Sequence, residues 1–131
     1  KLVRSAEIQP TWIITLADTL ERAGSHASEL REKGVNMIAL EDMSPRSMLA
    51  ALAAAGVARV MVEAGPSLST AFMQENLVDT LYWYKAPETM GRGETDLLAA
   101  IAKTPRHGRA ETLNLGADTL EIIEFKSCLP D

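Results

Sequence analysis

The sequence predicts a single α/β domain spanning residues 1–131. We expect a mostly parallel sheet, flanking helices and a carboxyl-terminal antiparallel hairpin. β-prone and helix-prone segments alternate between residues 11 and 76, as in strand–helix–strand units with right-handed crossovers. Two later β-prone segments, 111–115 and 119–125, flank a turn at Gly116, which predicts the hairpin. With 131 residues, of which 47% are hydrophobic, the chain can form a real core.

Composition excludes several classes of protein. The net charge is −5 and lysine and arginine form no run, which argues against nucleic acid as the main partner. No apolar run reaches membrane-spanning length, and no signal peptide is present. The single cysteine, Cys128, excludes a disulfide framework and a cysteine zinc site within one chain. We therefore expect a cytoplasmic protein. Because residues 1–11 resemble the interior of a chain, we also expect a piece of a longer protein.

The first third predicts a strand, a helix and a second strand. Thr11–Leu16 and Val35–Leu40 have strand composition. The polar, helix-prone segment between them runs from Asp18 to Lys33, with Gly34 placed to end it. The run from Gly24 to His26 is a candidate interruption, and His26 is expected at the surface.

A second helix is predicted to begin at Ser44-Pro45, a cap and first-turn pair, and to end at Gly56. The acids Glu41 and Asp42 precede it. Adjacent residues of a strand point to opposite faces, so a solvated loop explains this pair better than a metal or acid–base site.

The stretch from Val57 to Asn76 predicts a buried strand, a glycine turn and a third helix. Val57–Val62 is the strand, with Glu63 at its carboxyl end. Gly65 can adopt backbone angles that other residues avoid and lets a ligand approach closely, and Pro66 suits the first helical position. Asn76 is expected to end the helix in a left-handed conformation.

The start of this third helix is a candidate anion site. Free N–H groups and a partial positive charge at a helix amino terminus favour phosphate, and Ser67, Ser69 and Thr70 add hydroxyl groups. Ligands of α/β sheets collect at the carboxyl ends of strands, where Glu63 is expected. The alternative is that Glu63 caps a turn and the hydroxyl groups only solvate the helix end.

The remaining segments carry weaker signals. Thr80–Tyr84 is an aromatic, β-prone strand, and 97–101 is a short helical patch. The turn Gly91-Arg92-Gly93 and the loop around His107 are expected to be solvated, with no catalytic triad near His107.

Four motifs together resemble one enzyme family. They are Val62-Glu63-Ala64-Gly65-Pro66-Ser67-Leu68, Leu77-Val78-Asp79-Thr80-Leu81, Tyr84-Lys85-Ala86-Pro87, and Gly91. Their order and spacing resemble the later part of the reductase domain of the bifunctional riboflavin-biosynthesis deaminase/reductase. The resemblance implies a dihydrofolate-reductase-like fold.

The resemblance also implies an activity and a site. NADPH would reduce the ribosyl group of 5-amino-6-(5-phosphoribosylamino)uracil to a ribityl chain, without a metal. Glu63 would contact the pyrimidine ribose phosphate, and Thr15 would contact the cofactor. The residues implied to hold the NADPH phosphates are Gly65, Pro66, Ser67, Leu68, Ser69, Thr70 and Ala71. No catalytic residue is identified, and a homodimer is expected because the family is generally oligomeric.

Departures from the family pattern leave alternatives open. Ala64 replaces a common glycine, and Lys85 stands where an apolar residue is usual. The family's first strand would precede Lys1, and the motifs of the zinc deaminase half are absent from this sequence. One alternative is a dihydrofolate-reductase-like reductase of another small substrate. Another is a non-catalytic α/β module that dimerises through Thr80–Tyr84 and the terminal hairpin.

Overall fold

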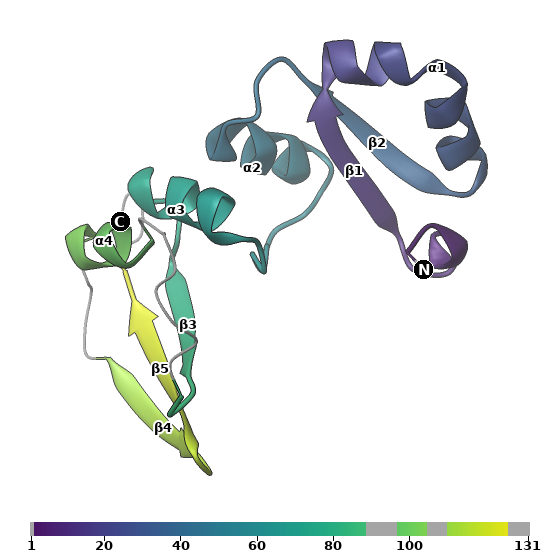
Figure 1. Cartoon of the computed structure of the whole chain (residues 1–131). Coiled ribbons are helices and arrows are strands. Elements are labelled where there is room, and N and C mark those ends of the chain that lie inside the picture. The colour runs from purple at the N-terminus through teal and green to yellow at the C-terminus, as the bar shows by residue number, and fades with distance from the viewer. Residues whose placement is uncertain (1, 89–96, 105–109, 126–131) are drawn as a thin grey trace. The chain divides into compact units, whose positions relative to one another are not determined.

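A computed structural model describes residues 2–88, 97–104 and 110–125 (Figure 1). The chain divides into two compact units, Lys1–Val60 and Met61–Asp131, each of which is described by itself. The predictions on Gly91-Arg92-Gly93, His107 and Cys128 lie outside the described residues, and the single domain stays a prediction.

Unit 1 is built around a pair of parallel strands. Each residue of the first strand pairs with the residue of the second strand that lies 24 positions later, from Thr11 with Val35 to Leu16 with Leu40. A helix connects the strands, as a parallel pair requires. Both predicted strands are confirmed to the residue. The elements are η1 (Leu2–Ser5), β1 (Thr11–Leu16), α1 (Ala17–Glu32), β2 (Val35–Leu40) and α2 (Pro45–Ala54).

The helix boundaries of unit 1 follow the sequence signals. Gly24 has φ 49° and ψ −119°, which confirms the interruption of α1. Gly34 has φ 80°, and a Cβ there would lie 3.2 Å from the Glu7 side chain, so this turn requires glycine. Ser44 caps α2 by accepting a hydrogen bond from the Ser47 N–H at 3.2 Å.

Unit 2 contains an antiparallel sheet of three strands. β5 (Asp118–Glu124) lies between β3 (Thr80–Lys85) and β4 (Glu111–Leu115), and the β4–β5 hairpin confirms the prediction for residues 111–125 (Figure 1). Asn76, which follows α3 (Pro66–Gln74), has φ 54° and confirms the left-handed helix end. The elements are α3 (Pro66–Gln74), β3 (Thr80–Lys85), α4 (Leu97–Lys103), β4 (Glu111–Leu115) and β5 (Asp118–Glu124).

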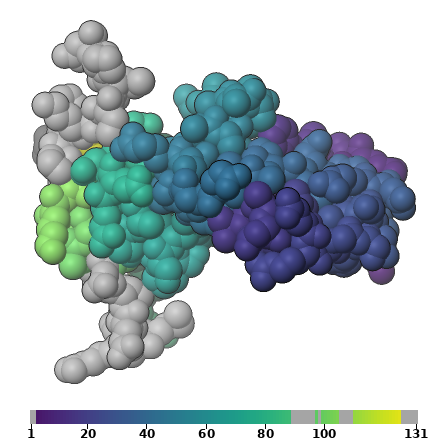
Figure 2. Space-filling model, turned by 90° about the horizontal axis from the view of Figure 1, so that it is seen from above, coloured from purple at the N-terminus to yellow at the C-terminus, as the bar shows by residue number. Residues whose placement is uncertain are grey.

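The core of unit 2 lies between one face of this sheet and its two helices. Ile123 of β5 is only 1% exposed. It packs with Met73 of α3, with Ala100 and Ile101 of α4, and with Phe125. Helices α3 and α4 contact one another, and Figure 2 shows their atoms, in teal and green, side by side. Four partly buried residues surround this cluster: Val78, Leu81, Trp83 and Leu97.

The prediction of a strand at Val57–Val62 is wrong in this structure. Residues 57–65 form no regular element, and Met61 is 78% exposed. A strand needs a neighbour to pair its N–H and C=O groups, and none of the five described strands pairs with this segment. The prediction of a mostly parallel sheet is also wrong for the described strands. Only β1 and β2 are parallel, while the aromatic strand β3 pairs antiparallel with β5.

The left-handed conformation of Asn76 gives a test of the α3–β3 connection. Asn76→Val should lower the free energy of unfolding by about 1–2 kcal/mol, because a β-branched residue is strained at positive φ. Asn76→Gly, the matched control, should lose less than half as much. Thermal melting of the three chains measures the difference. Equal melting temperatures for the valine and glycine variants would contradict the assigned backbone conformation.

Candidate functional site

The start of α3 presents free hydrogen-bond donors. Gly65 is its N-cap residue and offers no side chain to accept a hydrogen bond, while Pro66 has no N–H. The first backbone hydrogen bond at the start of α3 runs from the Ser69 N–H to the Gly65 carbonyl at 3.2 Å. Within the described parts of the chain, nothing accepts from the N–H groups of Ser67 and Leu68. These two groups and the helix dipole form a site suited to an anion.

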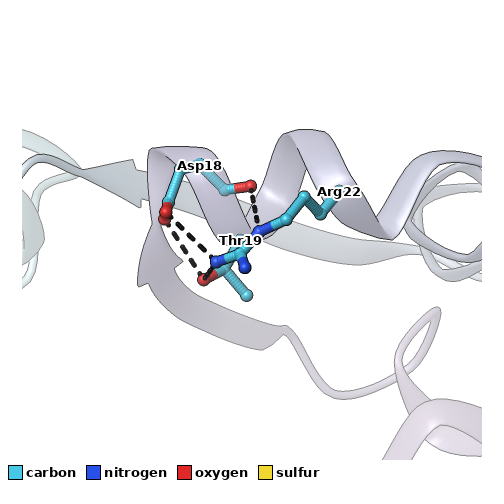
Figure 3. Close-up of polar contacts among 3 residues, drawn as sticks. All are labelled: Asp18, Thr19 and Arg22. Carbon is cyan, nitrogen blue, oxygen red and sulfur yellow. Dashed lines mark hydrogen bonds and ion pairs between the residues drawn. The ribbon is translucent and has the colours of Figure 1, made fainter.

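The other two long helices begin differently. The first turn of α1 contains Asp18, whose carboxylate receives a hydrogen bond from Arg22 at 3.1 Å (Figure 3). Arg22 also donates to the Asp18 carbonyl at 3.2 Å. The α2 start is already capped by Ser44. Among α1, α2 and α3, only α3 has a start with neither a side-chain cap nor an acidic residue in its first turn. A phosphate is therefore best accommodated at α3.

The hydroxyl groups of this segment differ in availability. Ser67 is exposed beside the free N–H groups. Ser69 donates its hydroxyl hydrogen to the Ala64 carbonyl at 3.2 Å, which fixes the turn before the helix. Thr70 is buried, and Ala71 is partly buried. Of the three predicted hydroxyl groups, Ser67 is the one best placed to meet a ligand.

Gly65 has an ordinary extended backbone, with φ −63° and ψ 169°. Gly65 therefore does not use the backbone angles that glycine alone adopts freely. A Cβ at Gly65 would meet no protein atom within 4 Å. The missing side chain thus leaves open space beside the helix start, rather than relieving strain.

Glu63 lies in the irregular segment that precedes α3. Because residues 57–62 form no strand, Glu63 does not stand at a strand end as predicted. Its side chain is exposed and makes no recorded hydrogen bond or ion pair to the described part of the chain. The carboxylate is therefore available as a hydrogen-bond acceptor two residues before the N-cap of α3.

Thr15 belongs to unit 1, whereas Glu63 and residues 65–71 belong to unit 2. Thr15 is the penultimate residue of β1, pairs with Ala39 and is partly buried. Its role in cofactor binding stays a prediction.

Asp42 takes part in a hydrogen-bond network before α2, where the sequence predicted only a solvated loop. The Asp42 carboxylate accepts from the Ser44 N–H and from the Ser47 hydroxyl, both at 2.8 Å. The Ser44 hydroxyl also lies 3.0 Å from that of Ser47. These hydrogen bonds hold the pKa of Asp42 below its ordinary value of 3.8, and the bonds with Ser44 contribute most to this lowering. The signal in the sequence was an aspartate two residues before the capping serine, a pattern that favours such turns.

Other candidate groups have simple structural explanations. His26 is exposed, as predicted, and lies 3.9 Å from the Glu29 carboxylate. Within residues 2–88, 97–104 and 110–125, no cluster of three His, Cys, Asp or Glu side chains could hold a metal. In those same ranges, no helix combines the length and apolar character needed to cross a bilayer.

Comparison with known proteins identifies relatives over most of the chain. Residues 2–119 match the family described as "RibD C-terminal domain". The riboflavin biosynthesis protein RibD of Aquifex aeolicus (strain VF5) is 31% identical over 127 residues, which cover 95% of this chain and 34% of that protein. RibD of Corynebacterium ammoniagenes is 34% identical over 98 residues, which cover 75% of this chain and 28% of that protein.

The Asp42 network predicts a pH-dependent contribution to stability. Because the folded pKa is lowered, this contribution is present above pH 3.8 and is lost as pH falls through the folded pKa. Asp42→Asn should therefore lower the melting temperature at pH 7, and the difference from the unchanged chain should shrink below pH 3.8. The matched control is Glu41→Gln, which removes an adjacent exposed carboxylate with no recorded hydrogen bond. Equal effects of the two variants at pH 7 would contradict the assignment.

Proposed function

This chain belongs to the RibD C-terminal domain family, and from that premise we propose that it supplies the NADPH-binding part of a riboflavin-biosynthesis reductase. The family consists of NADPH-dependent reductases with a dihydrofolate-reductase-like domain. The chain spans about a third of the Aquifex relative, so the activity and substrate of a whole protein are part of the proposal.

The observation that carries the proposal is the uncapped start of α3, which fits the phosphates of a nucleotide cofactor. The N–H groups of Ser67 and Leu68 lack acceptors within the described parts of the chain, and no acidic side chain lies in the first turn. Gly65 adds open space, so a phosphate oxygen could approach the backbone closely. The exposed hydroxyl of Ser67 supplies a further donor.

The proposed reaction is reduction of the ribosyl group of 5-amino-6-(5-phosphoribosylamino)uracil to a ribityl chain. NADPH, when bound, supplies the hydride for this step. The residues of this chain bind the cofactor and the substrate and orient them for the reaction. The α3 start holds cofactor phosphate, while the free carboxylate of Glu63 accepts hydrogen bonds from substrate N–H or hydroxyl groups. Thr15, the penultimate residue of β1, is proposed as a further cofactor contact.

The Gly65 position tests the phosphate site. Gly65→Val should weaken NADPH binding about tenfold or more, because its side chain fills the space that the phosphate would enter. Gly65→Ala should have a smaller effect. Calorimetric titration of each chain with NADPH, repeated with NADH, measures both affinities and the preference for NADPH.

Thermal melting provides the control for this series. Gly65 has φ −63° and open space around it, so alanine and valine should change the melting temperature little. Undiminished NADPH affinity in a folded Gly65→Val chain would exclude residues 65–71 as the phosphate site. If the folded chain binds neither nucleotide, either a further segment completes the cofactor site or the chain is a non-catalytic module, and a titration of a longer chain separates the two.

Glu63 tests the proposed substrate contact. Glu63→Gln keeps the shape of the side chain but removes its charge, so kcat/KM for the aminopyrimidine ribose phosphate should fall about 10- to 100-fold. NADPH affinity should stay the same, because Glu63 is assigned to the substrate. The assay follows NADPH consumption in the enzyme that contains this chain, and Glu75→Gln serves as a control elsewhere in unit 2. Unchanged kcat/KM in Glu63→Gln would remove Glu63 from the site.

A further inference from the structure

Ser69 of α3 holds two successive carbonyl groups of the turn that leads into the helix. Its N–H donates to the Gly65 carbonyl, and its hydroxyl donates to the Ala64 carbonyl, each at 3.2 Å. A helical serine more often bonds back to a carbonyl three or four residues earlier. Here the hydroxyl reaches past the N-cap, Gly65, to the residue before it. The peptide groups on either side of Gly65 are therefore oriented by one residue of the helix.

Without Ser69, this turn has little to hold it. Gly65 has more backbone freedom than other residue types, and a Cβ at that position would meet no atom within 4 Å. Ala64 and Gly65 are both exposed, so packing does not restrain them. Within the described parts of the chain, Ser69 is the only hydrogen-bond donor to either carbonyl. The open space that suits a phosphate thus depends on a flexible residue, and the two bonds from Ser69 offset that flexibility.

The position of the Ala64 carbonyl matters for an anion at the α3 start. A carbonyl oxygen carries a partial negative charge and accepts hydrogen bonds from free N–H groups. The N–H groups of Ser67 and Leu68 have no acceptor among the described residues, so a carbonyl released from the turn would compete with a phosphate for them. The bond from the Ser69 hydroxyl keeps the Ala64 oxygen occupied. The donors of the helix start thus stay free for the ligand.

We propose that Ser69 is a positioning residue of the phosphate site, and that it acts through the Ala64–Gly65 turn without touching the cofactor. Its hydroxyl hydrogen is already donated to Ala64, so that hydrogen is not available to a phosphate oxygen. Ser67 differs, because its exposed hydroxyl donates to none of the described residues. This inference rests on the proposed function, since it assigns how the NADPH phosphate site is kept open.

NMR relaxation of the free chain tests whether Ser69 orders the turn. In the unchanged chain, the order parameter of the Gly65 N–H should be that of a rigid backbone, about 0.85. In Ser69→Ala it should fall toward about 0.6, because both the hydroxyl and its bond to Ala64 are lost. Ser69→Thr keeps a hydroxyl and should keep the order parameter of the unchanged chain. Equal order parameters in Ser69→Ala and the unchanged chain overturn the proposal.

Calorimetric titration with NADPH connects the turn to binding. Ser69→Ala should weaken binding roughly 3- to 10-fold, the effect of one hydrogen bond, and Ser69→Thr should restore it to within about twofold. Ser67→Ala is the matched control. It removes a free hydroxyl of the same helix start, so it should weaken binding while leaving the Gly65 order parameter unchanged. Undiminished NADPH affinity in a folded Ser69→Ala chain overturns the proposal.

Thermal melting separates positioning from a merely structural role. Phe72 and Met73 anchor α3 in the core, so the serine variants should melt within about 2 °C of the unchanged chain. Loss of affinity together with a large fall in melting temperature, which threonine does not restore, overturns the positioning role.

Failure of the inference is distinguishable from failure of the proposed function. If Gly65→Val weakens NADPH binding and Ser69→Ala does not, the phosphate site stands and the role of Ser69 falls. If neither the folded chain nor the longer enzyme that contains it binds NADPH, the proposed function falls and the role of Ser69 falls with it.

Discussion

The pairing of β5 with a strand on each side is the constraint on which unit 2 depends. Its register sets Leu81 opposite Ile123 and Leu113 opposite Leu120. Because side chains alternate along a strand, this register sends Ile123 and Phe125 into the helix-covered core and sends Leu120 and Ile122 to the opposite face of the sheet. A slip by one residue would exchange the two faces, so burial of Ile123 fixes the register.

The two ends of helix α3 differ in burial, and the proposed phosphate site falls at the exposed end. Its later residues Thr70, Phe72 and Met73 are buried, and Met73 belongs to the core cluster with Ala100 and Ile101. Its first turn is exposed and uncapped. A helix anchored at one end can hold the free N–H groups of its other end in fixed positions. Such preorganised donors bind an anion without a further entropic cost for ordering the backbone.

The acidic groups of the two units have different neighbours, and this difference supports the choice of site. Asp18 is paired with Arg22, and Asp42 is satisfied by Ser44 and Ser47. Glu63 has no hydrogen bond or ion pair with the residues that the structure describes. A carboxylate without a partner keeps its acceptor capacity for a ligand, whereas the aspartates at the first two helices already stabilise local turns.

The sequence by itself determined the local elements, because their signals lie within a few residues of one another. The bounds of β1 and β2, the Ser44 cap, the Gly24 interruption, the Asn76 helix end and the β4–β5 hairpin all followed from local composition. The four motifs between Val62 and Gly91 also pointed to the family that the comparisons show. Only the tertiary structure decided which segments pair. Val57–Val62 has the composition of a buried strand, yet strand formation needs a partner ladder, and the described strands provide none. The helix-covered face of the sheet in unit 2 likewise depends on contacts between residues far apart in the chain. A local sequence pattern does not specify such contacts.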